Sequence, residues 1–152
     1  MTHHIFIPIA MAPVAKTALP TPTLVSVEEQ EVLNLTNQLR ASVGCAALVV
    51  DEHLQVAAEG HTSYMATTNI MSHTGAQDSS PSIRAKNAGY TGLVGENVAY
   101  GYPTSAAVVE AWRTSKGHYE NMTRCSYKHI GIALVKTANG TAYWTQDFGE
   151  PR

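Results

Sequence analysis

The chain has 152 residues, of which 44% are hydrophobic, and this suits one domain with a core of its own. Its formal net charge is −2 and its 10 Lys and Arg residues are scattered, which argues against nucleic-acid binding because phosphate contacts need clustered basic side chains. No apolar run reaches about 18 residues, so the sequence predicts no transmembrane segment.

The first 24 residues differ in composition from the rest. An apolar segment over residues 5–15 ends in small residues, as the core of a signal peptide does, yet no Lys or Arg precedes it. A signal peptide and a disordered leader both stay open. Residues 17–23 are rich in Thr and Pro, which indicates a linker because proline cannot continue a helix. We therefore expect the folded domain over residues 25–152.

Four amphipathic helices are predicted before the last third of the chain. We expect them over residues 26–41, 51–65, 82–88 and 106–114. Ser26, Asp51 and Thr104 are residue types that cap helix N-termini, and Gly89 ends the third helix. His61 falls on the apolar face of the second helix, which favours a hydrogen-bonded core histidine over a ligand.

The last third predicts paired strands. Residues 130–135 and 142–148 are rich in β-branched and aromatic side chains, and Asn139-Gly140 between them is a strong hairpin signal. Residues 94–100 should add another strand. Helices around a small, mostly antiparallel sheet make an α+β layered domain.

Two cysteines, Cys45 and Cys125, bear on the redox compartment of the protein. They form no Cys-x-x-Cys pattern, which excludes zinc fingers and thioredoxin-type redox motifs. A single structural disulfide is favoured beside the apolar leader, and a pair of buried thiols is the alternative.

Three ionisable residues in apolar surroundings are candidates for chemistry: His73, Glu96 and His118. Two imidazoles and a carboxylate form a zinc-type ligand set with an open fourth position. Their spacing matches no metal motif, and residue types alone favour the alternative that each satisfies neighbouring backbone groups. Ser115 and His118 also lie one helical turn apart, but no orienting acid is evident for nucleophilic catalysis.

Four ordered motifs carry a resemblance to a known family. They lie at residues 71–73, 95–99, 112–122 and 143–149. In order and spacing they resemble the CAP superfamily of cysteine-rich secretory proteins, antigen 5 and pathogenesis-related proteins, also called the SCP domain. The match covers about Val27–Gly149, and its detail is most similar to the short secreted bacterial branch.

The resemblance implies a three-layer α-β-α sandwich with a central, mostly antiparallel sheet and a surface cleft. Two histidines and two glutamates line that cleft in the family, sometimes with a divalent cation. His73 and His118 match the histidines and Glu96 the first glutamate, but Ser115 stands where the second glutamate would be. The loss of that charge should weaken metal affinity. Asn97 is expected to hold backbone groups in a turn after Glu96.

Further expectations concern the walls of the cleft and the cysteines. Tyr100 and Tyr102 should flank the cleft, and Asp147 should line it from the last strand. Similar bacterial chains imply that Cys45 and Cys125 form a disulfide.

Two functional hypotheses follow. The first is a secreted, monomeric, non-catalytic module whose cleft binds a small lipid, a glycan or an extracellular protein. It requires no cofactor, and Zn²⁺ or another divalent cation at His73, His118 and Glu96 is optional. The second is a metal-assisted hydrolase of peptidase or esterase type that uses the same cleft.

Overall fold

Helices and strands alternate along the part of the chain that the structure, a computed structural model, describes, which is residues 26–152. The predicted leader and linker over residues 1–24 lie outside the described residues. The helices are α1 (Val27–Ser42), α2 (Glu52–Thr68), α3 (Pro81–Asn87), α4 (Ser105–Arg113) and α5 (Lys116–Met122), with a 3-10 turn, η1, at Ala76–Asp78. The strands are β1 (Val49–Val50), β2 (Gly92–Tyr100), β3 (His129–Lys136) and β4 (Ala142–Pro151). The predicted helices and strands are thus confirmed close to their expected bounds.

Side-chain caps explain where the two long helices begin. Ser26 Oγ accepts a hydrogen bond from the backbone N–H of Glu29 at 3.3 Å, and the Glu29 carboxylate accepts one from the backbone N–H of Ser26 at 2.9 Å. Asp51 Oδ1 accepts from the backbone N–H groups of His53 and Leu54 at 2.9 and 3.0 Å. Because these bonds satisfy N–H groups that lack partners within the helix, local sequence places the starts of α1 and α2.

Two elements of the structure, β1 and α5, are not among those predicted from the sequence. Strand β1 has two residues, too few to show alternation, and it pairs in parallel with β3, so that Val49 lies opposite His129. Helix α5 has seven residues and follows α4 almost directly. Both elements depend on what packs against them rather than on a local pattern.

The sheet has the strand order β1-β3-β4-β2. The two pairs that β4 makes are antiparallel, and β2 forms the edge opposite β1. The hairpin between β3 and β4 turns at the predicted Asn139-Gly140, where Gly140 has a φ of 86°. Glycine suits that position because it adopts positive φ without steric strain.

The register of β2 on β4 decides which side chains share a face. Glu96 lies opposite Asp147, and the next pair is Asn97 opposite Gln146. Successive residues of a strand point to opposite faces, so these two pairs project from opposite sides of the sheet.

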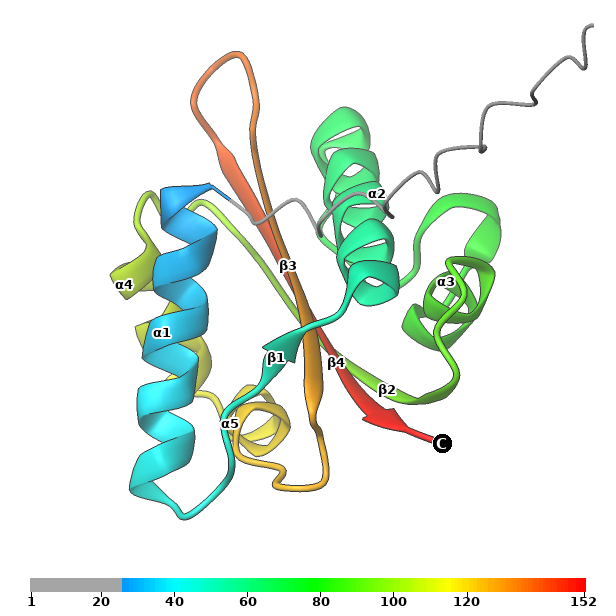
Figure 1. Cartoon of the computed structure of the whole chain (residues 1–152). Coiled ribbons are helices and arrows are strands. Elements are labelled where there is room, and N and C mark those ends of the chain that lie inside the picture. Colours follow the sequence, from blue (N-terminus) through cyan, green and yellow to red (C-terminus); the bar gives the residue numbers. More distant parts are fainter. Residues whose placement is uncertain (1–25) are drawn as a thin grey trace, which may run out of the picture.

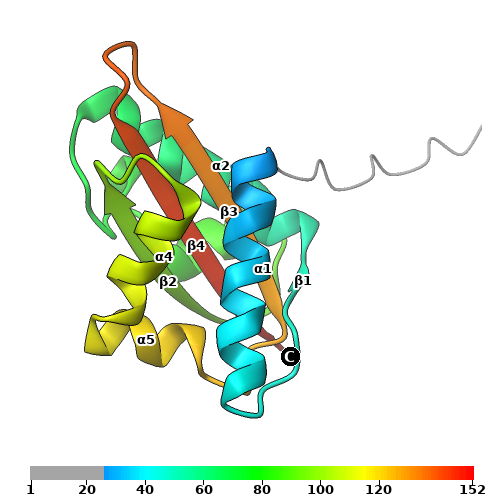
Figure 2. The same cartoon turned by 90° about the vertical axis from the view of Figure 1, so that its left-hand side faces the viewer.

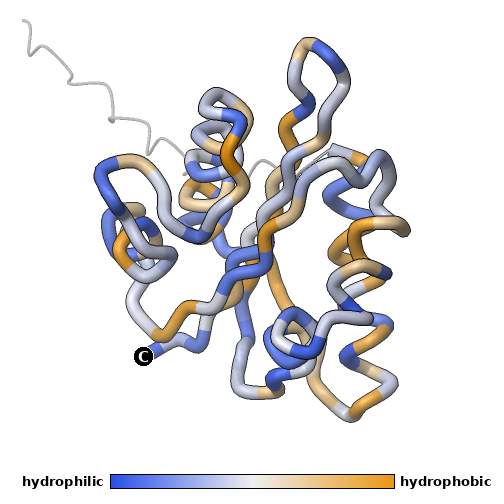
Figure 3. The backbone as a smooth tube through the Cα atoms, turned by 180° about the vertical axis from the view of Figure 1, so that it is seen from behind, coloured by the Kyte–Doolittle hydropathy of each residue, from blue (hydrophilic) through white to orange (hydrophobic). Residues whose placement is uncertain are grey.

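Helices cover both faces of the sheet. Figures 1 and 2 show α1, α4 and α5 on one face and α2 and α3 on the other. The largest core cluster lies on the α1 side and includes Trp112, Trp144 and Phe148, none more than 1% exposed. In Figure 3 hydrophilic residues mark the tip of the β3–β4 hairpin, away from this core. The molecule is therefore the expected three-layer α-β-α sandwich.

A disulfide and a buried arginine close the end of the molecule near α5. Cys45 and Cys125 are bonded, with their Cα atoms 4.9 Å apart, as the resemblance implies. Beside them the fully buried Arg40 donates to backbone carbonyls, among them those of Met122 and Tyr127, each at 3.0 Å. The C-terminal end of α1 is thus fastened to the chain that follows α5.

Candidate functional site

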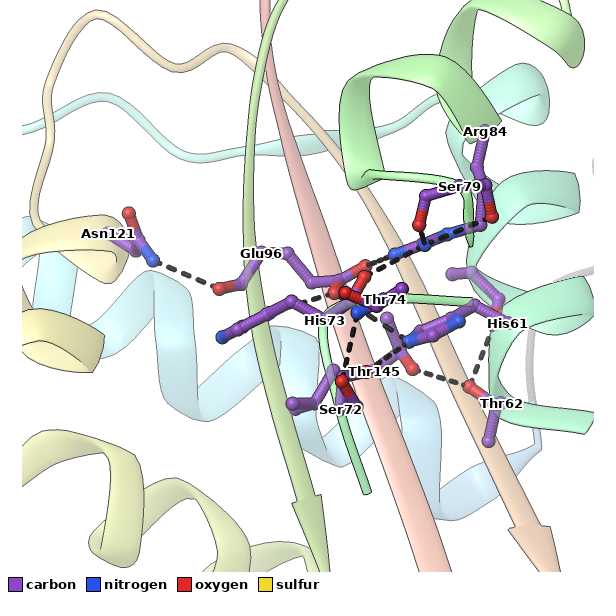
Figure 4. Close-up of polar contacts among 12 residues, drawn as sticks. His61, Thr62, Ser72, His73, Thr74, Ser79, Arg84, Glu96, Asn121 and Thr145 are labelled. Carbon is purple, nitrogen blue, oxygen red and sulfur yellow. Dashed lines mark hydrogen bonds and ion pairs between the residues drawn. The ribbon is translucent and has the colours of Figure 1, made fainter. Parts of the chain in front are cut away.

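Glu96 is the centre of a polar cluster on the α2 side of the sheet. Glu96 lies in the middle of β2 and is only 5% exposed. One carboxylate oxygen lies 2.9 Å from Nδ1 of His73, and the other accepts from Nη2 of Arg84 at 2.7 Å (Figure 4). Both oxygens are therefore paired with nitrogen donors, as a buried carboxylate requires.

Arg84 links Glu96 to the loop that carries His73. From α3, its Nη1 donates to the backbone carbonyls of His73 at 2.9 Å and Ser79 at 2.7 Å. The His73 side chain is 55% exposed, so its ring stands at the surface while its Nδ1 contacts the buried acid. Sequence reasoning missed Arg84, since a single arginine on a short helix carries no motif.

His61, which is fully buried on α2, also lies close to Glu96. Its Nε2 is 2.6 Å from the carbonyl oxygen of Ser72 and 3.8 Å from the Glu96 carboxylate. The prediction of a core histidine is right about its burial, but Nδ1 has no partner among the described residues. Burial is the main cause that lowers the pKa of His61 below its ordinary value, which favours the neutral ring.

Asp147 gives the cluster a second acid, and its position corrects one expectation. It is fully buried opposite Glu96 and does not line the cleft as predicted. Burial and then the charge of Glu96 raise the pKa of Asp147 well above its ordinary value. Burial acts in the same direction on Glu96, but contacts with His73, Asp147 and Arg84 outweigh it, so the pKa of Glu96 is lowered. The two pKa values are therefore shifted in opposite directions, with Glu96 the stronger acid of the pair.

A cavity of about 310 Å³ lies along β2, and no side chain of this charged cluster lines it. Its walls are mostly apolar and aromatic, with two polar groups, and comprise Met71, Val98, Ala99, Tyr100, Tyr102, Ala111, Trp112, Ser115 and His118. Tyr100 and Tyr102, which are expected to flank the cleft, are among these walls. Burial and then the nearby His73 lower the pKa of His118, which favours its neutral form.

The five predicted cleft residues thus take different places. Ser115 and His118 line the cavity, while His73 is half-exposed and Glu96 and Asn97 are buried in β2, and these three do not line it. The expected turn after Glu96 does not exist, because the strand continues past it. Asn97 instead reaches across to α5, where its Nδ2 donates to the His118 carbonyl at 3.2 Å.

The residues fit a divalent cation only in part. Over residues 26–152, no group of three or more His, Cys, Asp or Glu side chains is placed to hold an ion. Glu96 acts as a hydrogen-bond partner of His73, an arrangement that orients metal-binding histidines in other proteins. Nε2 of His73 and the ring of His118 would be the contacts of such an ion, so the metal site stays a prediction.

Comparisons with known proteins agree with the motifs. The family model for the CAP cysteine-rich secretory protein family matches residues 33–148. The chain belongs to the CAP family. Protein YkwD of Bacillus subtilis is 34% identical to this CAP chain over 140 residues, 91% of the chain and 53% of YkwD. Membrane protein YlbC of the same organism is 33% identical over 122 residues, 79% of the chain and 34% of YlbC.

This CAP chain spans about half or less of the length of those relatives. Although YlbC is named a membrane protein, no helix between residues 26 and 152 of this chain has the length and apolar character to cross a bilayer.

Solved structures show the same fold. An extracellular SCP-domain protein of Bacillus anthracis has a TM-score of 0.73 and 24% identity, over 81% of this chain and 40% of the other. An outer surface protein of Borrelia burgdorferi has a TM-score of 0.77 and 22% identity, over 85% of this chain and 97% of the other. The structure of NaASP2 with Zn²⁺ has a TM-score of 0.61 and 16% identity, over 89% of this chain and 85% of the other.

Proposed function

We propose that this CAP domain is an extracellular, non-catalytic binding module that holds a small amphipathic ligand, of the lipid class, in the cavity along β2. The observation that carries the proposal is the cavity lining. Apolar and aromatic side chains such as Val98, Tyr100 and Trp112 form most of it, and Ser115 and His118 supply its polar groups. Cavities of about 300 Å³ or more with mostly apolar walls and few polar groups are typical of small-molecule sites.

The state of the acids supports binding rather than acid–base catalysis. Both oxygens of Glu96 are occupied by His73 and Arg84, and Asp147 is sealed in the interior. Ser115 stands at the cavity where the resemblance implies a second glutamate, and no carboxylate among residues 26–152 lines it. A ligand there meets neutral hydrogen-bonding groups.

A divalent cation is an optional addition at His73 and His118. When bound it would supply positive charge at the polar side of the cavity. The NaASP2 structure contains Zn²⁺, which makes zinc the ion to test here. An extracellular location is supported by the names of the Bacillus anthracis and Borrelia burgdorferi proteins that share the fold.

A cavity-filling variant tests the proposal with decanoic acid and the uncharged decanol as probes. Ala111→Phe fills the cavity from α4 and should weaken probe binding at least about tenfold, measured by calorimetry. Ala106→Phe is the matched control on the same helix, since Ala106 does not line this cavity. Equal binding by both variants, or no binding by the parent, would contradict the proposal.

Two further outcomes would replace the proposed function with a different one. Binding of a chitin-type oligosaccharide in place of both amphiphiles would change the ligand class from lipid to glycan. Hydrolysis of a p-nitrophenyl ester that is lost on chelation, and in His73→Ala with His118→Ala, would establish the hydrolase instead.

A further inference from the structure

A chain of side-chain hydrogen bonds crosses the α1 side of the sheet from α1 to α5. Gln146 on β4 donates from Nε2 to Thr36 Oγ1 on α1 at 2.9 Å. Its Oε1 accepts from Nδ2 of Asn97 on β2 at 3.2 Å. Asn97 Oδ1 in turn accepts from Nδ2 of Asn121 on α5 at 3.0 Å. Four elements are thus joined by groups that are fully buried, apart from the half-buried Asn121.

The α1 end of this amide chain imposes a direction on it. The Thr36 hydroxyl donates to the carbonyl oxygen of Val32, one turn earlier in α1, at 2.7 Å. Since a hydroxyl has one proton, Thr36 Oγ1 is left as an acceptor, and only the NH₂ group of Gln146 can face it. The Gln146 oxygen then points to Asn97, which must present its own NH₂ group.

The α5 end imposes the same direction independently. Asn97 Nδ2 also donates to the backbone carbonyl of His118 at 3.2 Å, and Asn121 Nδ2 donates to that of Glu96 at 3.1 Å. Carbonyls only accept, so neither amide can be turned round without placing two oxygens against each other. One arrangement of the amide chain therefore satisfies both ends, and it fastens the backbone of α5 at His118.

We propose that this amide chain is a positioning device that sets where α5, and with it the ring of His118, stands at the cavity. Thr36 and Gln146 act through Asn97 and do not line the cavity themselves. Their effect on ligand binding rests on the proposed function, but the placement of His118 does not and is measurable in the free protein.

The test is the substitution Thr36→Val, which keeps the shape of the side chain and removes the acceptor for Gln146. Thr62→Val is the matched control, because Thr62 is equally buried on α2 and its hydroxyl contacts Ala58 O and Thr145 Oγ1 across the other face of the sheet. NMR signals of the His118 ring and amide exchange in α5 are recorded for both. We expect shifted His118 signals and exchange in α5 that is at least about tenfold faster in Thr36→Val only, with return toward the parent in Thr36→Ser.

Changes in α5 that are equal in the two valine variants would overturn the proposal, since they would report general loss of stability. If Thr36→Val does not fold, Asn121→Ala tests the other end of the amide chain and should shift the same His118 signals. Unshifted signals in that variant would also overturn the proposal. Failure of the parent to bind decanoic acid would remove the proposed function and leave this inference to be judged by the ring signals alone.

Discussion

Two adjacent residue pairs in the middle of β2 and β4 face opposite layers of the molecule, and they differ in kind. Glu96 and Asp147 are acids and belong to a charged cluster under α2 and α3. Asn97 and Gln146 are amides and belong to a neutral chain under α1 and α5. A step of one residue along each strand therefore separates an ionisable network from one with no titratable side chain.

The two networks satisfy their buried atoms to different degrees. The buried side-chain atoms without a partner in the described part of the chain are His61 Nδ1, Arg84 Nε and both oxygens of Asp147, all in the charged cluster. The amide chain leaves no such atom among residues 26–152. The charged side should therefore depend strongly on single substitutions and on pH, and the amide side should depend on geometry alone.

The largest effect is expected when the charged cluster loses its arginine. Arg84→Ala leaves the ionised Glu96 buried without its ion pair to Arg84 and should lower the free energy of unfolding by about 3–5 kcal/mol. Urea denaturation at neutral pH measures the loss. Arg113→Ala is the control, because its ion pair with Glu110 is exposed to solvent and should contribute little to stability. Similar losses in both variants would show that the Arg84 contact is no stronger than a surface ion pair.

The second effect concerns the disulfide that fastens the α5 end. Replacement of both Cys45 and Cys125 by alanine should lower the free energy of unfolding by about 4 kcal/mol, because the bridge closes a loop of 80 residues in the unfolded chain. Thiol counting under denaturing, non-reducing conditions should find none in the parent. Two reactive thiols, or a double variant as stable as the parent, would be the contrary result. With Arg40 still holding the same loops, the amide chain should persist.

The third effect is a slope with pH, and it separates the two networks most directly. The raised pKa of Asp147 means that the stability it contributes is complete below about pH 4 and is lost as pH rises toward that pKa. In Asp147→Asn this loss is absent. As pH rises, the free energy of unfolding of the variant should therefore increase relative to that of the parent by up to about 1.4 kcal/mol per pH unit. Urea denaturation from about pH 4 to about pH 7 measures the difference.

Thr36→Val is the comparison for that slope. It should lower stability by about 1–3 kcal/mol, because it leaves a buried amide N–H unpaired, and by the same amount at every pH. The contrast between the networks would be contradicted if the stability difference between Thr36→Val and the parent changed with pH. It would also be contradicted if the difference between Asp147→Asn and the parent were the same at every pH.

Much of the fold could be predicted from local sequence. Ser26 and Asp51 mark the starts of helices because a cap involves only the next few residues, and Asn139-Gly140 marks a hairpin for the same reason. Strand β1 escaped prediction, since its two residues become a strand only through pairing with β3. The motifs around His73, Glu96 and His118 indicated the family and its cleft.

The sequence by itself therefore determined helices α1 to α4, the hairpin, the family and most of the residues that gather around the cleft. Only the tertiary structure decided that Arg84 and Asp147 share the site with Glu96, and that Gln146 connects Thr36 to the cleft through Asn97. The physical reason is the register of β2 on β4. It brings together residues far apart in the chain and assigns neighbouring side chains to opposite faces, and no local pattern of residues encodes that alignment.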